Sequence, residues 1–390
     1  MDASCLPALR VKGRGLLPIV QGGMGVGVSG HRLAGHVARH NAVGTIASVD
    51  LRRHHEDLME ETGRCRDRAA IERANLVALD REIRAALEIA DGQGMIAVNV
   101  MRAVTQYADY VRQSCVSGAG AIVMGAGLPL DLPDLTAEFP GVALIPILSD
   151  ARGVSILLKK WQRKQRLPDA IVIEHPRYAG GHLGAANETD VNDTRFDFEV
   201  VIPAVLEVFR EMGIERSRIP LIAAGGINSH EKFLQLLELG ASAVQLGTPF
   251  AVTEEGDAHP NFKRVLAEAK PEDIVTFMSV AGLPARAVNT PWLARYLKRV
   301  NKLKACANDR AHKCTLAWDC LIQCGLRDSI AKFGQFCIDN QLAAALKGDV
   351  EKGLFFRGSE TLPFGAAIRP VRDLINYFLT GEKPEVALVA

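Results

Sequence analysis

The sequence predicts an α/β fold, a (β/α)8 TIM barrel with helical additions, on three observations. Short, nearly all-apolar runs alternate with longer amphipathic segments, as expected when helices cover both faces of a parallel sheet. The alternation gives eight strand–helix units, which favours a closed barrel over the alternative of an open doubly wound sheet. Glycines follow the carboxyl ends of the strands, where barrel enzymes build their sites.

Eight segments have the character of buried parallel strands, because each is almost entirely apolar. They lie at residues 18–23, 44–48, 95–101, 121–127, 143–149, 170–176, 220–227 and 243–250. Helical patterns occupy residues 31–40, 107–118, 154–166, 198–213 and 229–240 between them. Gly213 and Gly240 stand at the ends of the last two patterns, where a helix C-cap favours glycine.

Two stretches fall outside this repeat. Residues 51–94 are expected to form a helical insertion in a barrel that spans residues 1–260. Leu76, Leu79, Ile83 and Leu87 recur there at helical spacing and predict one buried helix face. Residues 261–390 contain a cysteine cluster and a helical tail, and we expect them to form a C-terminal helical lobe packed on the barrel.

Composition limits the function classes. Lys and Arg total 46 and Asp and Glu total 45, a balance that argues against a dedicated nucleic-acid binder. No apolar run approaches the roughly 18–20 residues of a membrane span. The first residues lack the apolar core of a signal peptide, so we expect a soluble cytoplasmic protein.

Two glycine-containing motifs predict a phosphate site. AAGGIN (Ala223–Asn228) and QLGTPF (Gln245–Phe250) follow the seventh and eighth strands. Their glycines would bring bare backbone N–H groups up to a phosphate, and Ser229 can cap the helix that follows. The alternative is that both motifs are tight turns without a ligand.

Further motifs surround the same end of the barrel. AGGHLG (Ala179–Gly184) would place His182 at the barrel mouth, where an imidazole can take a proton at neutral pH; a merely structural histidine is the alternative. The glycine-rich run from Pro18 to Gly30 predicts a backbone that passes close to a flat ligand or bends sharply. Gln21 could bind a heterocycle, and Asn99 is a polar residue that needs partners inside the mouth.

Taken together, these motifs resemble the nitronate monooxygenase family, which also includes flavin-type enoyl-acyl carrier protein reductases. The resemblance runs through QGGMGVGVS, VNVM, GAGLP, AGGHLG, AAGGI and QLGTPF, in that order. It implies an FMN-binding barrel with His182 as the catalytic histidine. It further implies cofactor contacts from Gln21, Gly22, Gly23, Met24 and Asn99 to the flavin, and from Gly180, Gly181, Gly225, Gly226, Gly247 and Thr248 to its phosphate.

One departure from the family concerns the strand before AGGHLG. The chain has Glu174-His175-Pro176-Arg177, where relatives often have Glu-Gly before the turn. This segment adds bulk and charge beside the expected flavin.

The cysteine cluster permits two interpretations. Cys306, Cys314, Cys320, Cys324 and Cys337 are candidate ligands of an iron–sulfur cluster or a zinc ion. Because no C-x-x-C pair is present, buried or paired thiols are the alternative.

The resemblance implies an oxidoreductase that converts alkyl nitronates and O2 to a carbonyl compound and nitrite. A second hypothesis is an NAD(P)H-dependent FMN reductase acting on an enoyl thioester or a quinone, with an acyl carrier protein as a partner. A third is a non-catalytic phosphate-binding barrel. Under the first hypothesis the partner is a small-molecule substrate, with neither nucleic acid nor membrane, and a homodimer is allowed.

Overall fold

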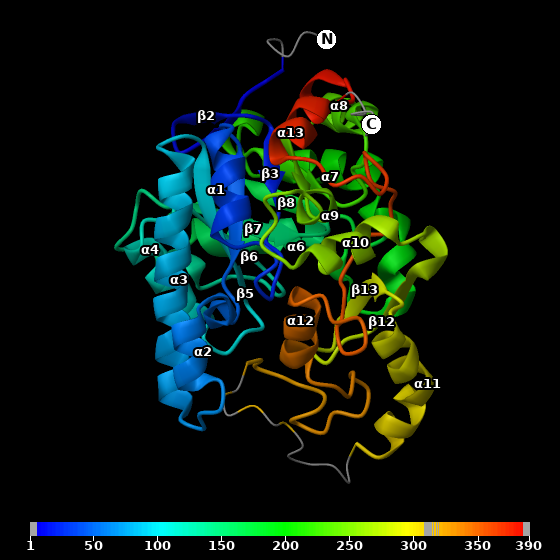
Figure 1. Ribbon diagram of the computed structural model, residues 1–390. Coiled ribbons are helices and arrows are strands. Elements are labelled where there is room, and N and C mark those ends of the chain that lie inside the picture. Colours follow the sequence, from blue (N-terminus) through cyan, green and yellow to red (C-terminus); the bar gives the residue numbers. More distant parts are fainter. Residues whose placement is uncertain (1–5, 308–313, 315, 317, 319, 385–390) are drawn as a thin grey trace.

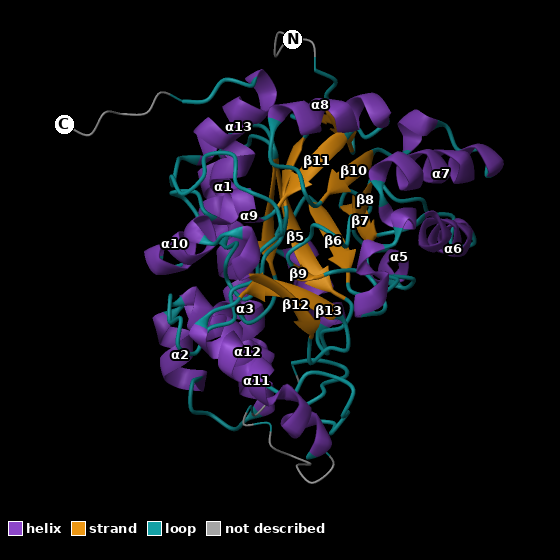
Figure 2. Cartoon of the chain, turned by 90° about the vertical axis from the view of Figure 1, so that its right-hand side faces the viewer, coloured by secondary structure: helices purple, strands orange, loops and turns teal. Residues whose placement is uncertain are grey.

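The computed structural model describes residues 6–307, 314, 316, 318 and 320–384, and it confirms the predicted barrel. Eight parallel strands close in the order β10-β11-β3-β4-β5-β6-β7-β8. Figure 2 shows them as the central orange sheet, surrounded by helices. Their bounds are β3 (Ile19–Gln21), β4 (Val43–Ala47), β5 (Met95–Met101), β6 (Ala121–Gly125), β7 (Ala143–Leu148), β8 (Ile171–Glu174), β10 (Leu221–Ala224) and β11 (Ala243–Leu246).

Alternating side chains along each strand form two buried layers, one inside the barrel and one between the barrel and the helices. In β5, Met95 and Ala97 pack inside the barrel, whereas Ile96, Val98 and Val100 pack outward under the helices. Successive strand side chains point to opposite faces, so both sets must be apolar when both faces are covered. An amino-terminal hairpin of β1 (Leu9–Val11) and β2 (Arg14–Leu16) adds apolar side chains to the inner layer.

Most barrel helices lie where the sequence predicts them. They are α1 (His31–Arg39), α4 (Tyr107–Val116), α6 (Ala151–Gln162), α7 (Phe198–Glu211) and α8 (His230–Leu239), whereas the single turn α5 (Leu132–Leu135) was not predicted. The helix α6 begins three residues before the predicted start, because Asp150 caps it and accepts a hydrogen bond from Gly153 N at 2.6 Å. Short 3-10 turns lie at Leu51–His54, Glu188–Asn192, Thr194–Phe196, Arg216–Arg218 and Pro271–Asp273.

Residues 51–94 differ from the expected insertion. They form α2 (Glu56–Thr62) and α3 (Arg68–Ala90), and α3 packs between α1 and α4 as the second helix of the barrel ring (Figure 1). Only the segment between β4 and α3, which contains α2, is therefore an addition to the standard eight strand–helix units of the barrel. Leu79 and Ile83 are buried as predicted, but Leu87 is 37% exposed, because the buried face of α3 turns through Glu82 and Ala86 instead.

The C-terminal region also differs from a purely helical lobe. The last helix, α13 (Val371–Thr380), packs against α1 and α8, beside the single turn α9 (Thr248–Ala251). Figure 1 shows it in red beside blue α1. We therefore use "the lobe" for residues 260–370 alone. The lobe contains α10 (Pro260–Glu268), α11 (Pro291–Ala305), α12 (Ile338–Leu346), β12 (Ile274–Met278) and β13 (Pro284–Val288).

The two lobe strands join the barrel through a third strand. The antiparallel sheet has the order β12-β13-β9, and β9 (Gly181–His182) comes from the barrel loop that follows β8. Figure 2 shows this sheet across the carboxyl end of the barrel. The lobe thus covers the end where the predicted site residues lie. Within the described residues, no helix is long and apolar enough to cross a membrane.

Candidate active site

A cavity of about 680 Å³ lies at the carboxyl ends of the barrel strands, between the barrel loops and the lobe. This is the end of the barrel and the range of volume that substrate and cofactor sites occupy. Most of the predicted site residues line it: Gly22, Gly23, Met24, Asn99, Gly180, Gly181, His182, Gly225, Gly226, Gly247 and Thr248.

Gln21 is placed differently from the prediction. It is fully buried and is absent from the cavity wall. Its side-chain amide donates to Thr45 O at 3.0 Å and also to Gly22 O, and its Oε1 accepts from Thr45 N at 2.8 Å. These bonds tie the end of β3 to β4, so the side chain is engaged in holding the strands together and not in facing a ligand.

The two predicted phosphate loops are neighbours in space. Ala224 of β10 pairs with Gln245 of β11, so the glycines that follow both strands share one rim. Gly226 adopts φ +74°, and a Cβ there would lie 2.7 Å from Cγ of Tyr178. That glycine is therefore required by packing as well as by any ligand.

Gly247 faces open space. A Cβ at this position would meet only the Sδ of Met24, at 3.9 Å, and its φ of −101° suits any residue. Its ψ of −85° lies outside the regions that residues with a Cβ prefer, so both the backbone and a ligand that approaches it closely favour a glycine here. Thr248, the next residue, accepts a hydrogen bond from Gly358 N at 3.0 Å and so joins this loop to the lobe.

Two amide side chains on the cavity wall are available to a ligand. Within the described residues, the carboxamide of Asn99 makes no side-chain hydrogen bond, and the Oε1 of Gln245 is buried without a partner. A buried polar atom is normally satisfied, so the Oε1 of Gln245 favours a bound molecule with ring heteroatoms or hydroxyls, and the half-buried amide of Asn99 faces the same cavity. The prediction missed Gln245, although it begins the QLGTPF motif, because a one-dimensional pattern does not show side-chain direction.

The structure brings His182 to the cavity by strand pairing. Ala285 of β13 pairs with His182 of β9, and Ser279 Oγ lies 2.8 Å from its Nε2. The ring also contacts Phe356 edge to face, with centroids 5.7 Å apart. Burial lowers the pKa of His182 to about 4, so the imidazole is uncharged at neutral pH.

Arg286 holds the loop that leads to His182. Its guanidinium donates to Pro176 O at 3.1 Å and to Ala179 O at 2.6 Å. The adjoining pair Arg286–Gly181 continues the β9–β13 ladder. A residue of the lobe thus fixes the backbone immediately before the histidine.

Glu174 adds a carboxyl to the cavity wall, at the end of β8. Burial raises the pKa of this carboxyl to about 7. Its neighbour His175 turns away: the Nε2 of His175 lies 3.2 Å from Asp197, and burial lowers its pKa to about 4. Of the unusual segment 174–177, Glu174 thus faces the cavity and His175 supports the loop.

The cysteines give no support to the predicted metal or iron–sulfur site. Cys306, Cys314, Cys320, Cys324 and Cys337 are free thiols, and the described part of the chain has no group of three or more His, Cys, Asp or Glu side chains suited to a metal. Burial raises the pKa values of Cys320, Cys324 and Cys337, the last to about 12. Cys320 also lines the cavity.

Comparison with known proteins identifies the family to which the chain belongs. The sequence pattern of the nitronate monooxygenase family matches residues 14–381. A probable nitronate monooxygenase of Bacillus subtilis is 27% identical over 288 residues, which are 71% of this chain and 77% of the relative. One of Staphylococcus saprophyticus is 30% identical over 123 residues, 32% of this chain and only 33% of the relative.

Two solved structures share the fold. FabK of Thermotoga maritima has a TM-score of 0.62 and 22% identity, covering 93% of this chain and 91% of its own. Nitroalkane oxidase of Streptomyces ansochromogenes has a TM-score of 0.61 and 18% identity, covering 94% and 95%. With the family pattern spanning both the barrel and the lobe, this chain belongs to the nitronate monooxygenase family and is an FMN-dependent oxidoreductase of that type.

Proposed function

We propose that this protein oxidises alkyl nitronates with O2 to a carbonyl compound and nitrite, at the cavity between barrel and lobe. The observation that carries the proposal is the placement of an uncharged histidine, His182, on the wall of a glycine-lined cavity. The family match supports the reaction class, and the cavity supplies residues suited to both cofactor and substrate.

The residues present fit FMN. Gly225, Gly226, Gly247 and Thr248 would hold its phosphate at the rim of β10 and β11, with Gly180 and Gly181 beside them. Gly22, Gly23 and Met24 would lie along the ring, and the amides of Asn99 and Gln245 would bond it. When bound, FMN supplies the redox chemistry, accepting electrons from the substrate and passing them to oxygen.

The protein's own contribution centres on His182. With a neutral nitroalkane, the imidazole would accept the α-proton at the ring nitrogen that is not bonded to Ser279, while the hydrogen bond between Nε2 and Ser279 Oγ, 2.8 Å long, would orient the ring. With a preformed nitronate no proton is removed, and His182 would instead orient the anion. Arg286 and the β9–β13 pairing keep the histidine loop in one position for either role.

A second candidate is a reductase in which NADH or NADPH reduces FMN and an enoyl thioester or quinone is the acceptor. The apolar part of the cavity, described below, suits the chain of such an acceptor. An acyl carrier protein would be its partner only under this alternative.

Anaerobic mixing of the FMN-loaded protein with ethylnitronate, NADH and NADPH in turn separates the candidates. We expect ethylnitronate to bleach the flavin rapidly and both nicotinamides to act slowly. Rapid bleaching by NADH or NADPH alone would favour the reductase. A folded protein that neither carries nor takes up FMN would leave the third hypothesis, a non-catalytic phosphate-binding barrel.

A further inference from the structure

The cavity has two chemically different halves, set by the order of the strands. In the closed ring, β5 stands opposite β10, and β6 stands opposite β11. The glycine loops after β10 and β11 therefore face the rim formed by the ends of β5 and β6. At that opposite rim the end of β6 is itself glycine-rich, with Gly125 and Gly127 on the cavity wall, whereas the end of β5 carries side chains.

Five residues form an apolar chamber on the β5 side of the cavity. Two come from the barrel and three from the lobe: Met101, Val104, Leu321, Ile338 and Leu342. Met101 and Leu342 keep part of their surface uncovered by the protein. The chamber thus offers apolar surface that the folded chain leaves for another molecule.

The lobe is joined directly to this rim. Val104 forms an antiparallel bridge with Leu321, and Ile322 N donates to Ala103 O at 2.9 Å. The helix α12 then presents Ile338, Leu342 and Ala345 to the cavity, a spacing of four and three residues along one helix face. These contacts fix the wall of the chamber in place.

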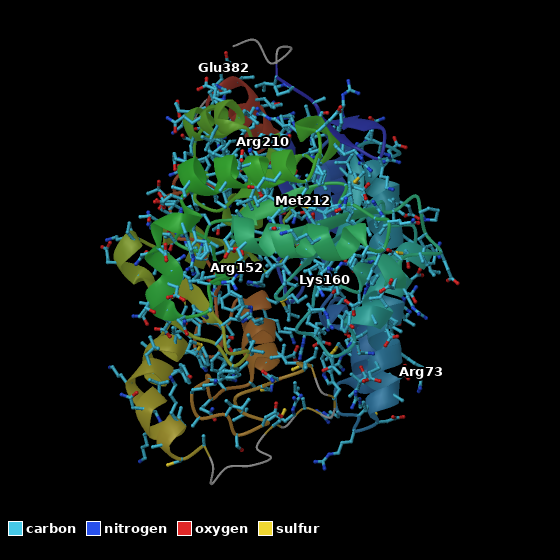
Figure 3. The ribbon with its side chains drawn as sticks, turned by 180° about the vertical axis from the view of Figure 1, so that it is seen from behind. Arg73, Arg152, Lys160, Arg210, Met212 and Glu382 are labelled. Carbon is cyan, nitrogen blue, oxygen red and sulfur yellow. The ribbon has the colours of Figure 1, made fainter. Side chains whose placement is uncertain are left out.

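Cationic side chains are scarce on the cavity wall, although four acidic residues also line it: Asp150, Glu174, Asp339 and Glu360. Among the described residues that line it, the only arginines or lysines are Arg152 and Arg357. Arg152 is exposed in the first turn of α6, apart from Lys160 near the other end of that helix (Figure 3). The guanidinium of Arg357 is bonded to the backbone carbonyls of Leu266, Gly358 and Glu360.

The carboxyl of Asp339 also lines the cavity: its Oδ2 accepts from Arg53 of the barrel, whereas its Oδ1 is buried without a partner among the described residues. The chamber therefore offers no cation to a carboxylate or phosphate on the substrate. An uncharged apolar group is the occupant that this surface stabilises.

We propose that the apolar chamber binds the unbranched aliphatic chain of the substrate and so sets a preference for longer chains. The inference deepens the proposed function and rests on it for the reacting group, which would lie toward His182. The same aliphatic chain could belong to an alkyl nitronate or to an enoyl thioester, and the experiment separates these sources.

The first test measures kcat/KM of the FMN-loaded enzyme on primary nitronates from nitroethane to nitrohexane. Each buried methylene should raise kcat/KM about threefold to fourfold until the chamber is filled, because burial of one CH2 is worth about 0.8 kcal/mol. A parallel series of enoyl thioesters with NADPH identifies the alternative source. A flat chain-length profile in both series would overturn the proposal.

Substitutions in α12 locate the effect. Leu342→Trp should fill the chamber and lower the ratio of long-chain to short-chain kcat/KM by at least tenfold. Asn340→Trp, on the exposed side of the same helix, is the matched control and should keep the wild-type ratio. Equal ratios in Leu342→Trp and wild type, with both proteins folded, would contradict the assignment.

Binding without turnover separates this inference from the proposed function. Calorimetric titration of the FMN-loaded wild-type protein with 1-butanol, 1-hexanol and 1-octanol should show affinity that rises with chain length. If affinity rises but no nitronate is oxidised, the chamber stands and the proposed reaction fails. If nitronates are oxidised with no dependence on chain length and the alcohols do not bind, the chamber assignment fails alone.

Discussion

Burial shifts the pKa values of two cavity side chains in opposite directions. It lowers the pKa of His182 to about 4 and raises that of Glu174 to about 7, because in both cases the charged form loses hydration. At neutral pH His182 is therefore unprotonated and able to accept a proton. Glu174 is divided between its acid and its carboxylate.

Replacing the proposed base tests the role of His182. His182→Ala should retain FMN but lose turnover on a neutral nitroalkane by roughly 10²–10⁴-fold, the usual contribution of general-base catalysis. Turnover of a preformed nitronate should fall less, since its proton has already left. Steady-state kinetics on both substrates measures the difference; equal losses would indicate that His182 orients the anion.

Gly247 tests the phosphate rim better than Gly226 does. The side chain of Gly247→Val has room, since only Met24 lies near it, and circular dichroism checks that the backbone at φ −101° and ψ −85° accepts it; the variant should block the phosphate and yield colourless protein. Gly226→Val is uninformative by comparison, because Tyr178 and the positive φ oppose it even without a ligand. Visible absorbance with circular dichroism of Gly247→Val decides the matter: a folded variant with full FMN content would place the phosphate elsewhere.

The sequence motifs located the cavity walls well and the side-chain directions poorly. Glycines after strands are readable, because a barrel puts all strand ends at one rim. Gln21 and Gln245 show the limit, since each stands within two residues of a glycine that follows a strand. Only the three-dimensional register shows that the first is fully bonded to Thr45 and that the second has a free oxygen facing inward.

At the scale of elements, α12 is attached to the barrel by a buried group of charges. Arg53 donates both to Asp50 of its own loop and to Asp339 in the first turn of α12. Burial, and next the charge of Asp50, raise the pKa of Asp339 to about 7, although Arg53 opposes the change. Near neutral pH this carboxyl is therefore partly protonated in the folded protein.

The pH dependence of stability tests this attachment. Because the pKa of Asp339 is higher in the folded protein than in the unfolded chain, protonated Asp339 favours the folded state. This contribution is fully present below the unfolded pKa, near 3.9, and is lost as pH rises through about 7. Asp339→Asn cannot ionise, so its stability relative to wild type should increase between pH 5 and pH 8. Because one pKa unit corresponds to about 1.4 kcal/mol, we expect a gain of the order of a few kcal/mol. Urea unfolding at both pH values measures it; parallel profiles would contradict the ionisation of Asp339.

The sequence could not predict elements that form only by pairing with a segment far away in the chain. The strand β9 has two residues and forms only because β13, about a hundred residues later, pairs with it. No local periodicity marks such a pair, although Gly180-Gly181-His182 identified the segment as functional. The cysteine-containing region was likewise predicted from the spacing of its cysteines alone; its thiols are free, and of the five only Cys324 is fully buried.

At the scale of the whole molecule, the barrel is completed by the two ends of the sequence. The amino-terminal hairpin packs against the inner layer of the barrel, and α13 fills the ring position between α8 and α1. The lobe is consequently an excursion from the eighth unit and not an appended domain. We infer that lobe and barrel unfold together, since removing α13 would expose the apolar surfaces of both of its neighbours.

A single buried side chain near the carboxyl end tests this closure. Phe378 of α13 is fully buried and contacts Phe233 of α8, with ring centroids 6.4 Å apart. Phe378→Ala should destabilise the whole protein by about 3–5 kcal/mol, the usual effect of emptying an aromatic site in a core. Val200→Ala, at a 49% exposed position on α7, is the control and should change stability by less than about 0.5 kcal/mol. Urea unfolding followed by circular dichroism gives both values. If Phe378→Ala cost no more than the control, α13 would be a loosely attached tail, and the barrel would have to be stable without its eighth helix.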